Sequence, residues 1–257
     1  YGTLNIIDSS QDKDGKLARS VSPLIDNYGT LNLSDAAFET TGTIAVRAQA
    51  NSVLNMKSGT LTADDNPIYV VSSNPTINVE SGTLNGGSNV NCQRACTVNL
   101  GTDNAPAGTV VLNCALSVNA SAKLNLNGAT INSVVGTIAE GSVFNNCLFK
   151  TDVSPQLPAG YKCVETLVEG ETFYAIETLA NEDATATIVR DGEILYYGDA
   201  AAAVRNLQDN DTLVFYGDYT EELPIINERN LTIDLNGCNI SNLNIRTTVS
   251  DSTGTPP

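Results

Sequence analysis

The chain has 257 residues, of which 41% are apolar and only 5% aromatic, and this length suits one elongated domain or two compact ones. Its 29 acidic and 13 basic residues give a formal net charge of −16, which argues against nucleic acid or an anionic membrane as a partner, because phosphate groups are bound by basic surfaces. No apolar run is long enough for membrane insertion, and the absence of His excludes zinc sites that mix Cys and His.

A tripeptide of apolar residue, Asn and apolar residue recurs along the first half of the chain. On a strand, alternate residues face opposite sides, so each copy is expected to turn its two apolar residues inward and its Asn outward. A repeat of this size buries its apolar face only by stacking on its neighbours, which predicts a solenoid. The copies begin at Leu4, Leu31, Leu54, Ile77, Val98 and Leu124, and two successive intervals, 54 − 31 and 77 − 54, are each 23 residues.

Two further apolar sets complete each repeat. The second set follows a turn that often contains Gly, and its members are Phe38, Leu61, Leu84 and Ile131. The third set alternates like a strand, in Ile44–Val46, Ile68–Val70, Val90–Cys92 and Leu112–Cys114. Three short strands per coil of about 22–24 residues predict an all-β, right-handed parallel β-helix rather than a leucine-rich repeat, which usually adds a helix or half-turn to each unit.

The second half of the chain changes character after Thr151, where Pro155, Pro158 and Gly160 mark a boundary. Asp191-Gly192 predicts a hairpin turn, and Asp199 is the expected N-cap of one short capping α-helix near 199–208. The predicted domains are 1–155, a parallel β-helix; 156–198, connecting β-strands with the hairpin; and 199–257, a helix cap with the first coils of a following β-helix.

Several motifs resemble pectate-lyase-like β-helix repeat modules of large bacterial cell-surface proteins. They are Tyr197-Gly198-Asp199 before an Ala-rich helix, Thr232–Gly237 with its ending Asp-Leu-Asn-Gly, Ile6–Ser9, and Asn27–Leu31. The resemblance implies that the helix caps the open end of the second column. It also implies an extracellular or cell-surface location and a role as an adhesin or stalk.

The outward Asn residues are the candidate ligand-binding residues. They are expected to form a ladder on one flat face, either as amides that hydrogen-bond up the stack or as a polar surface for host or environmental glycans. Binding of glycans usually involves an aromatic platform, for which Tyr28 and Tyr69 are the candidates. The Asn residues are Asn32, Asn55, Asn78, Asn99 and Asn125.

A group of acidic residues near the predicted helix is the candidate metal site. Calcium binds through carboxylate and carbonyl oxygens, and it is the one cofactor that this sequence suggests. The alternative is a solvated acidic loop. The residues are Asp209, Asp211, Asp218, Glu221 and Glu222.

The six cysteines allow 15 disulfide pairings if all are oxidised, and the sequence does not decide between reduced and oxidised forms. Cys92 and Cys114 are predicted to point inward as small apolar residues, at the places that Val46 and Val70 occupy in earlier coils. The full set is Cys92, Cys96, Cys114, Cys147, Cys163 and Cys238.

The sequence offers little support for catalysis. Asp64-Asp65 is the best pair of carboxylates, and Arg47 and Arg94 are the basic residues that could share a face, but neither set forms a recognisable acid–base constellation. We therefore expect a non-catalytic module, with a polysaccharide lyase or glycoside hydrolase as the alternative. A third alternative is a fibre subunit that joins end to end, or tandem modules of one chain, because Val249–Thr253 resembles Ile7–Ser10.

Overall fold

The computed structural model describes residues 2–227 and 229–246, and they form two compact units. The first unit is Tyr1–Gln156 with Cys163–Glu177, and the second is Leu157–Lys162 with Thr178–Pro257. The segment 156–198, expected to connect two domains, is thus shared between the units. The predicted similarity at Val249–Thr253 lies outside the described residues.

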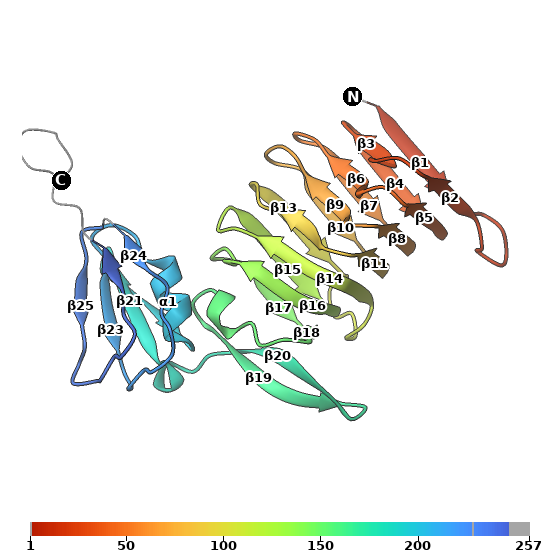
Figure 1. Cartoon of the computed structure of the whole chain (residues 1–257). Coiled ribbons are helices and arrows are strands. Elements are labelled where there is room, and N and C mark those ends of the chain that lie inside the picture. The colour runs from red at the N-terminus through yellow and green to blue at the C-terminus, as the bar shows by residue number, and fades with distance from the viewer. Residues whose placement is uncertain (1, 228, 247–257) are drawn as a thin grey trace, which may run out of the picture. The chain divides into compact units, whose positions relative to one another are not determined.

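The first unit is built from parallel strands that recur once per coil, as the coils of Figure 1 show. One sheet contains the apolar-Asn-apolar tripeptides. Its seven strands, in order, are β1 (Thr3–Ile7), β4 (Thr30–Ser34), β7 (Val53–Met56), β10 (Thr76–Val79), β13 (Cys96–Leu100), β15 (Ala122–Asn127) and β17 (Val143–Asn145).

The other strands of each coil form two further rows. The second row is β2 (Lys16–Arg19), β5 (Ala36–Thr40), β8 (Gly59–Ala63), β11 (Gly82–Gly86), β14 (Val110–Val118), β16 (Ala129–Gly136) and β18 (Leu148–Phe149), after which the hairpin β20 (Glu171–Thr178) and β19 (Tyr161–Val168) continues the sheet. The third row is β3 (Ile25–Asn27), β6 (Ile44–Ala48), β9 (Asn66–Val70) and β12 (Asn89–Cys92), and it joins the second half of β14. A short 3-10 turn, η1 (Ser154–Gln156), follows. The predicted right-handed parallel β-helix is confirmed.

The core of the first unit is a set of apolar columns that run from coil to coil. Leu31, Leu54 and Ile77 pair in register and are at most 1% exposed, so the predicted inward face is confirmed. The second apolar set also stacks in one line, as Phe38, Leu61, Leu84, Leu112 and Ile131. Leu112 therefore belongs to the second set, and its assignment to the third set is wrong.

The register of the predicted third set is also wrong by two residues at Val46. Val46 pairs with Ile68, whereas the prediction aligned it with Val70. Cys92 and Cys114 nevertheless point into the core and are 0% and 4% exposed. A shift of two residues keeps every side chain on its face, because only a shift of one residue reverses them.

The second unit begins a new set of coils. Its four-stranded sheet has the order β22 (Glu193–Tyr197), β21 (Ala186–Arg190), β23 (Thr212–Phe215) and β25 (Thr232–Asp234), and β24 (Ile226–Asn227) pairs with β26 (Ile245–Arg246). The pairs β23–β25 and β24–β26 are parallel, like the coils of the first unit. A 3-10 turn, η2 (Asn181–Asp183), precedes β21.

Local signals explain the ends of the hairpin and the helix of this unit. Asp191 and Gly192 have φ values of +50° and +85°, as a type I′ turn between β21 and β22 requires. The Asp199 side chain accepts hydrogen bonds from the amides of Ala201 and Ala202 at 2.7 and 3.2 Å, so it is the N-cap of α1 (Ala200–Asn206). The alanines of α1 pack into the core of the second unit, which confirms the predicted short helix.

Candidate ligand-binding face

The predicted Asn residues form one hydrogen-bonded row on the outer side of the first sheet, and Asn5 extends it. In each pair, the Nδ2 group donates to the Oδ1 atom of the Asn one coil earlier. The donor–acceptor distances are 2.6 Å for Asn32 to Asn5, 2.7 Å for Asn55 to Asn32, 2.7 Å for Asn78 to Asn55, 2.6 Å for Asn99 to Asn78 and 2.6 Å for Asn125 to Asn99. The predicted ladder is thus confirmed, whereas its binding role stays a prediction.

The ladder leaves hydrogen-bonding capacity on its outer side. A side-chain amide has two N–H donors and two acceptor lone pairs, and an inner member of the row uses one of each for its neighbours. One donor and one acceptor therefore remain at every coil, at the ~4.8 Å spacing of neighbouring strands. Hydroxyl groups both donate and accept hydrogen bonds, so a polyhydroxylated ligand matches such a row.

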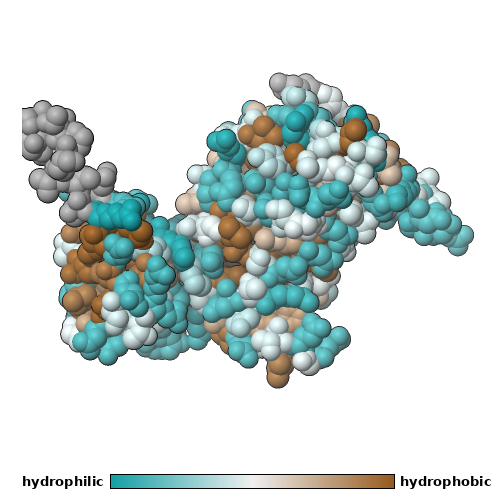
Figure 2. Space-filling view, viewed as in Figure 1, coloured by the Kyte–Doolittle hydropathy of each residue, from teal (hydrophilic) through white to brown (hydrophobic). Residues whose placement is uncertain are grey.

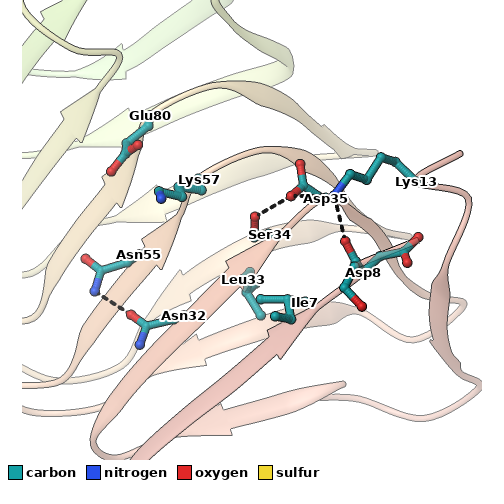
Figure 3. A pocket seen from close by; sticks show the side chains of 11 residues that line it. Ile7, Asp8, Lys13, Asn32, Leu33, Ser34, Asp35, Asn55, Lys57 and Glu80 are labelled. Atoms are coloured by element: carbon teal, nitrogen blue, oxygen red, sulfur yellow. Dashed lines mark hydrogen bonds and ion pairs between the residues drawn. The ribbon is translucent and has the colours of Figure 1, made fainter. Parts of the chain in front are cut away.

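At its N-terminal end the ladder borders a surface hollow of about 700 Å³, which we call the ladder hollow (Figure 3). This volume is within the usual range of small-molecule sites. Its walls come from β4 and β7, from the residues that follow β4, β7 and β10, and from the end of β1 with the loop after it. The lining residues are Ile7, Asp8, Ser9, Lys13, Asn32, Leu33, Ser34, Asp35, Asn55, Lys57 and Glu80.

Two aspartates of the ladder hollow are already engaged by the protein. Asp8 accepts hydrogen bonds from the hydroxyl and the amide of Ser10, at 2.6 and 2.8 Å, and from the amide of Gly15 at 2.7 Å. Asp35 accepts from the hydroxyls of Ser58 and Ser34 at 2.7 and 2.9 Å. The Ser10 hydroxyl lowers the pKa of Asp8 and the Ser58 hydroxyl that of Asp35 below the ordinary 3.8, so both are ionised at neutral pH.

Lys13 connects these two aspartates. Its Nζ atom lies 3.3 Å from an Asp35 carboxylate oxygen and 3.0 Å from the carbonyl oxygen of Asp8 (Figure 3). The trio therefore holds the loop after β1 in place.

Lys57 and Glu80 are the charged residues of the ladder hollow that the protein leaves unpaired. Within the described ranges, neither charged end has an ion-pair or hydrogen-bond partner, and both side chains face the hollow in Figure 3. Ile7, which is 64% exposed, adds an apolar wall. Sequence reasoning missed these three residues, although each follows a ladder Asn by two positions and so had to share its face.

The two candidate tyrosines do not lie beside the ladder. Tyr69 belongs to β9 in the third row, where it pairs in register with Arg47 and Asn91. Tyr28 directly follows β3, whose Asp26 accepts both arms of the Arg47 guanidinium. This guanidinium and, to a smaller extent, the Tyr28 hydroxyl lower the pKa of Asp26. The expected aromatic platform is thus not assembled at this face.

The five acidic residues of the candidate calcium site are not brought together either. Among the described residues, which include all five, no three Asp, Glu or Cys side chains cluster closely enough to hold a metal ion. Asp211 is 1% exposed and forms a two-armed ion pair with Arg190, at 3.0 and 2.8 Å. Asp218 instead accepts hydrogen bonds from Asn239, whose amide lowers its pKa. The calcium prediction is therefore corrected: Asp211 has an internal cation as its partner.

The candidate catalytic residues are also separated. Asp64 lines a second hollow of about 460 Å³ with Lys16, Arg19 and Glu39, whereas its neighbour Asp65 does not. Lys16 and Glu39 form an ion pair there. Arg47 is held by Asp26, and Arg94 lies in the turn between β12 and β13.

The surface of the described residues is mainly hydrophilic in the view of Figure 2. No helix in the described ranges has the length and apolar character needed to cross a membrane. Comparison of the chain with protein-family models, with curated proteins and with solved structures gave no match. The family resemblance therefore rests on the motifs and the fold.

Proposed function

We propose that this chain is a non-catalytic, extracellular β-helix module of a bacterial surface protein, an adhesin or stalk that contacts glycans along the ladder. The observation that carries the proposal is the ladder hollow. It combines spare amide donors and acceptors, the unpaired Lys57 and Glu80, and the apolar Ile7. Sugars present hydroxyl edges and apolar C–H faces, and many carry a charged group, so they complement all three.

The electrostatics of the hollow favour binding over hydrolysis. A glycosidase needs one carboxyl group that stays protonated near neutral pH, together with an ionised partner. Hydrogen bonds lower the pKa of both Asp8 and Asp35, which works against such an acid.

A glycan array tests the proposal. The double variant Asn32→Ala, Asn55→Ala removes the amides that line the hollow, and we expect roughly tenfold weaker retention or more, because each lost hydrogen bond contributes about 1 kcal/mol. Lys57→Met should reduce the retention of acidic oligosaccharides more than that of neutral ones.

The matched control is Asn85→Ala. Asn85 belongs to a similar short ladder on the second row, accepting from Asn113 at 2.9 Å and donating to Thr62 at 3.2 Å, but it lines no part of the hollow. Retention should therefore be unchanged. Equal losses for the control and the double variant, or no retention by the unaltered protein, would refute glycan contact at this face.

A second candidate function is end-to-end assembly, and the open edge of the first coil favours it. Strands β1, β2 and β3 each pair with a single neighbour, β4, β5 and β6 respectively. The core-side residues Leu4 and Leu17 are 51% and 38% exposed. Because an unpaired strand edge with apolar side chains templates further pairing, we propose that a coil of a second copy or of a tandem module stacks here.

Sedimentation velocity over a range of concentrations checks this assembly. The protein should form larger species as concentration rises, and Leu4→Lys should suppress them by placing a charge at the junction. Val135→Lys is the control, because Val135 is 54% exposed on β16, which has a strand neighbour on each side. A single monomeric species at every concentration, or equal suppression by both variants, would remove this candidate.

A further inference from the structure

Four side chains of different chemistry lie in one line across the ladder hollow. Ile7 pairs in register with Ser34 on the next coil. Lys57 and Glu80 continue the line on the two following coils, where their amides donate to carbonyls of the coil before at 2.9 and 2.8 Å. Successive coils therefore offer an apolar group, a hydroxyl, a cation and an anion, in this order, at steps of ~4.8 Å.

Lys57 and Glu80 are neighbours in this line, and they do not neutralise each other. Among the described residues, their charged ends form no ion pair with each other or with a third group. Both side chains are exposed and face the hollow (Figure 3). The hollow thus presents two opposite charges about one coil step, ~4.8 Å, apart.

This arrangement disfavours a ligand with charge of a single sign. Asp8 and Asp35 are engaged by hydrogen bonds and by Lys13, so Lys57 and Glu80 are the charges left for a ligand. A carboxylate at Lys57 is repelled by Glu80 one coil away, and an ammonium group at Glu80 is repelled by Lys57. At such short separations the repulsion offsets much of the attraction. A ligand that carries both groups gives each protein charge its counter-charge.

The ladder amides add the contacts that suit a sugar. Asn55 lies two residues before Lys57, and Asn32 lies two residues before Ser34, so each shares the outward face of its strand. Their spare donors and acceptors therefore lie beside the line of charges. Hydroxyl groups of the sugar units that reach Lys57 can bond to them.

We propose that the ladder hollow selects glycans that carry a carboxylate and an ammonium group on neighbouring sugar units. The carboxylate pairs with Lys57 and the ammonium group with Glu80, while Ile7 contacts the apolar C–H face of a sugar unit farther along the chain. This inference rests on the proposed glycan contact and names the class of glycan. Specificity of this kind comes from repulsion of the wrong ligands as well as from attraction of the right one.

A matched series of oligosaccharides of equal length tests the selection. All share one backbone, in which uronic acid and glucosamine units alternate. The zwitterionic probe keeps both charged groups, N-acetylation gives the acidic probe, carboxyl reduction gives the cationic probe, and both changes together give the neutral probe. Isothermal titration calorimetry measures the dissociation constants at slightly acidic pH, where the glucosamine amine is protonated, in low and in high salt.

We expect the unaltered protein to bind the zwitterionic probe about two- to fivefold more tightly than either singly charged probe, because an exposed charge pair contributes a small attraction. High salt should reduce this preference, since mobile ions screen exposed charges. Lys57→Met should remove most of the effect of carboxyl reduction. Glu80→Gln should remove most of the effect of N-acetylation.

The matched control is Lys123→Met. Lys123 lies on β15 and, like Lys57, is exposed on the outer face of the first sheet, but it lines no part of the hollow. This variant should leave the preference among the probes unchanged. A preference that survives both Lys57→Met and Glu80→Gln, or that Lys123→Met removes equally well, would overturn the selection.

Equal dissociation constants for all the probes, or tighter binding of a singly charged one, would also overturn it. If Asn32→Ala, Asn55→Ala still weakened every probe in that case, glycan contact itself would stand. Binding of no probe, together with an empty glycan array, would instead refute the proposed function and this inference with it.

Discussion

Replacing Leu54 with Asp is expected to lower the unfolding free energy of the first unit by at least several kcal/mol. Leu54 is 0% exposed and lies between Leu31 and Ile77 in one apolar column. The substitution removes buried apolar surface and adds a carboxyl group with no partner, and the burial of an unpaired charge is strongly unfavourable. The damage should also reach the neighbouring coils, because each coil is stabilised by the next.

Asn55→Asp is the matched comparison, because it changes the adjacent residue on the opposite face. The new carboxylate can still accept a hydrogen bond from Asn78 but cannot donate one to Asn32. The expected loss of unfolding free energy is therefore about 1 kcal/mol. Hydrogen exchange followed by mass spectrometry measures both variants peptide by peptide, and it separates the first unit from the second. Similar losses for the two variants would mean that the inner and outer faces are assigned the wrong way round.

Asp211→Ala is expected to destabilise the second unit by about 3–5 kcal/mol, because it leaves the Arg190 guanidinium largely buried without its counter-charge. Arg190 joins three parts of this unit. It donates two hydrogen bonds to Asp211 and one of 2.7 Å to the carbonyl of Asn206 at the end of α1. Asp211 in turn accepts from the amide of Gln208 at 2.6 Å. One substitution therefore loosens the hairpin, the helix and β23 together.

The control is Asp209→Ala, two residues away on the exposed surface, which should change the unfolding free energy very little. The double variant Arg190→Met, Asp211→Leu should recover most of the loss, since well-packed apolar residues often replace a buried ion pair without penalty. Hydrogen exchange at β21 and β23 is the readout. If Asp211→Ala were as mild as Asp209→Ala, the ion pair would contribute nothing and the corrected role of Asp211 would fail.

The faces of the first unit could be predicted from the sequence because a strand has a period of two. That period fixes which residues point inward, and Leu31, Leu54 and Ile77 follow it without interruption. It does not fix the register, since a shift of two residues leaves the faces unchanged. For this reason the sequence pattern aligns Val46 with Val70 instead of Ile68 and places Leu112 in the third row, although both residues are buried as it predicts.

The candidate site was only partly predictable for a different reason. The Asn ladder follows from the repeat, but the ladder hollow also needs the loop from Asp8 to Gly15. The path of this loop depends on hydrogen bonds that the repeat does not predict. The acidic residues near Asp211 in the sequence suggest calcium as its partner. Its actual partner, Arg190, lies 21 residues away, and only the packing of the hairpin against β23 brings them together.

The most direct test of glycan contact along the ladder is a side-chain amide NMR titration with the oligosaccharide that the array retains most strongly. The resonances of Asn32 and Asn55 are assigned by their disappearance in the single Ala variants, and those of Asn85 and Asn113 serve as an internal reference on the second row. The proposed function predicts saturable shifts at Asn32 and Asn55 while the reference amides stay unchanged. Shifts confined to Asn85 and Asn113, or no shift at any of the four amides, would contradict it.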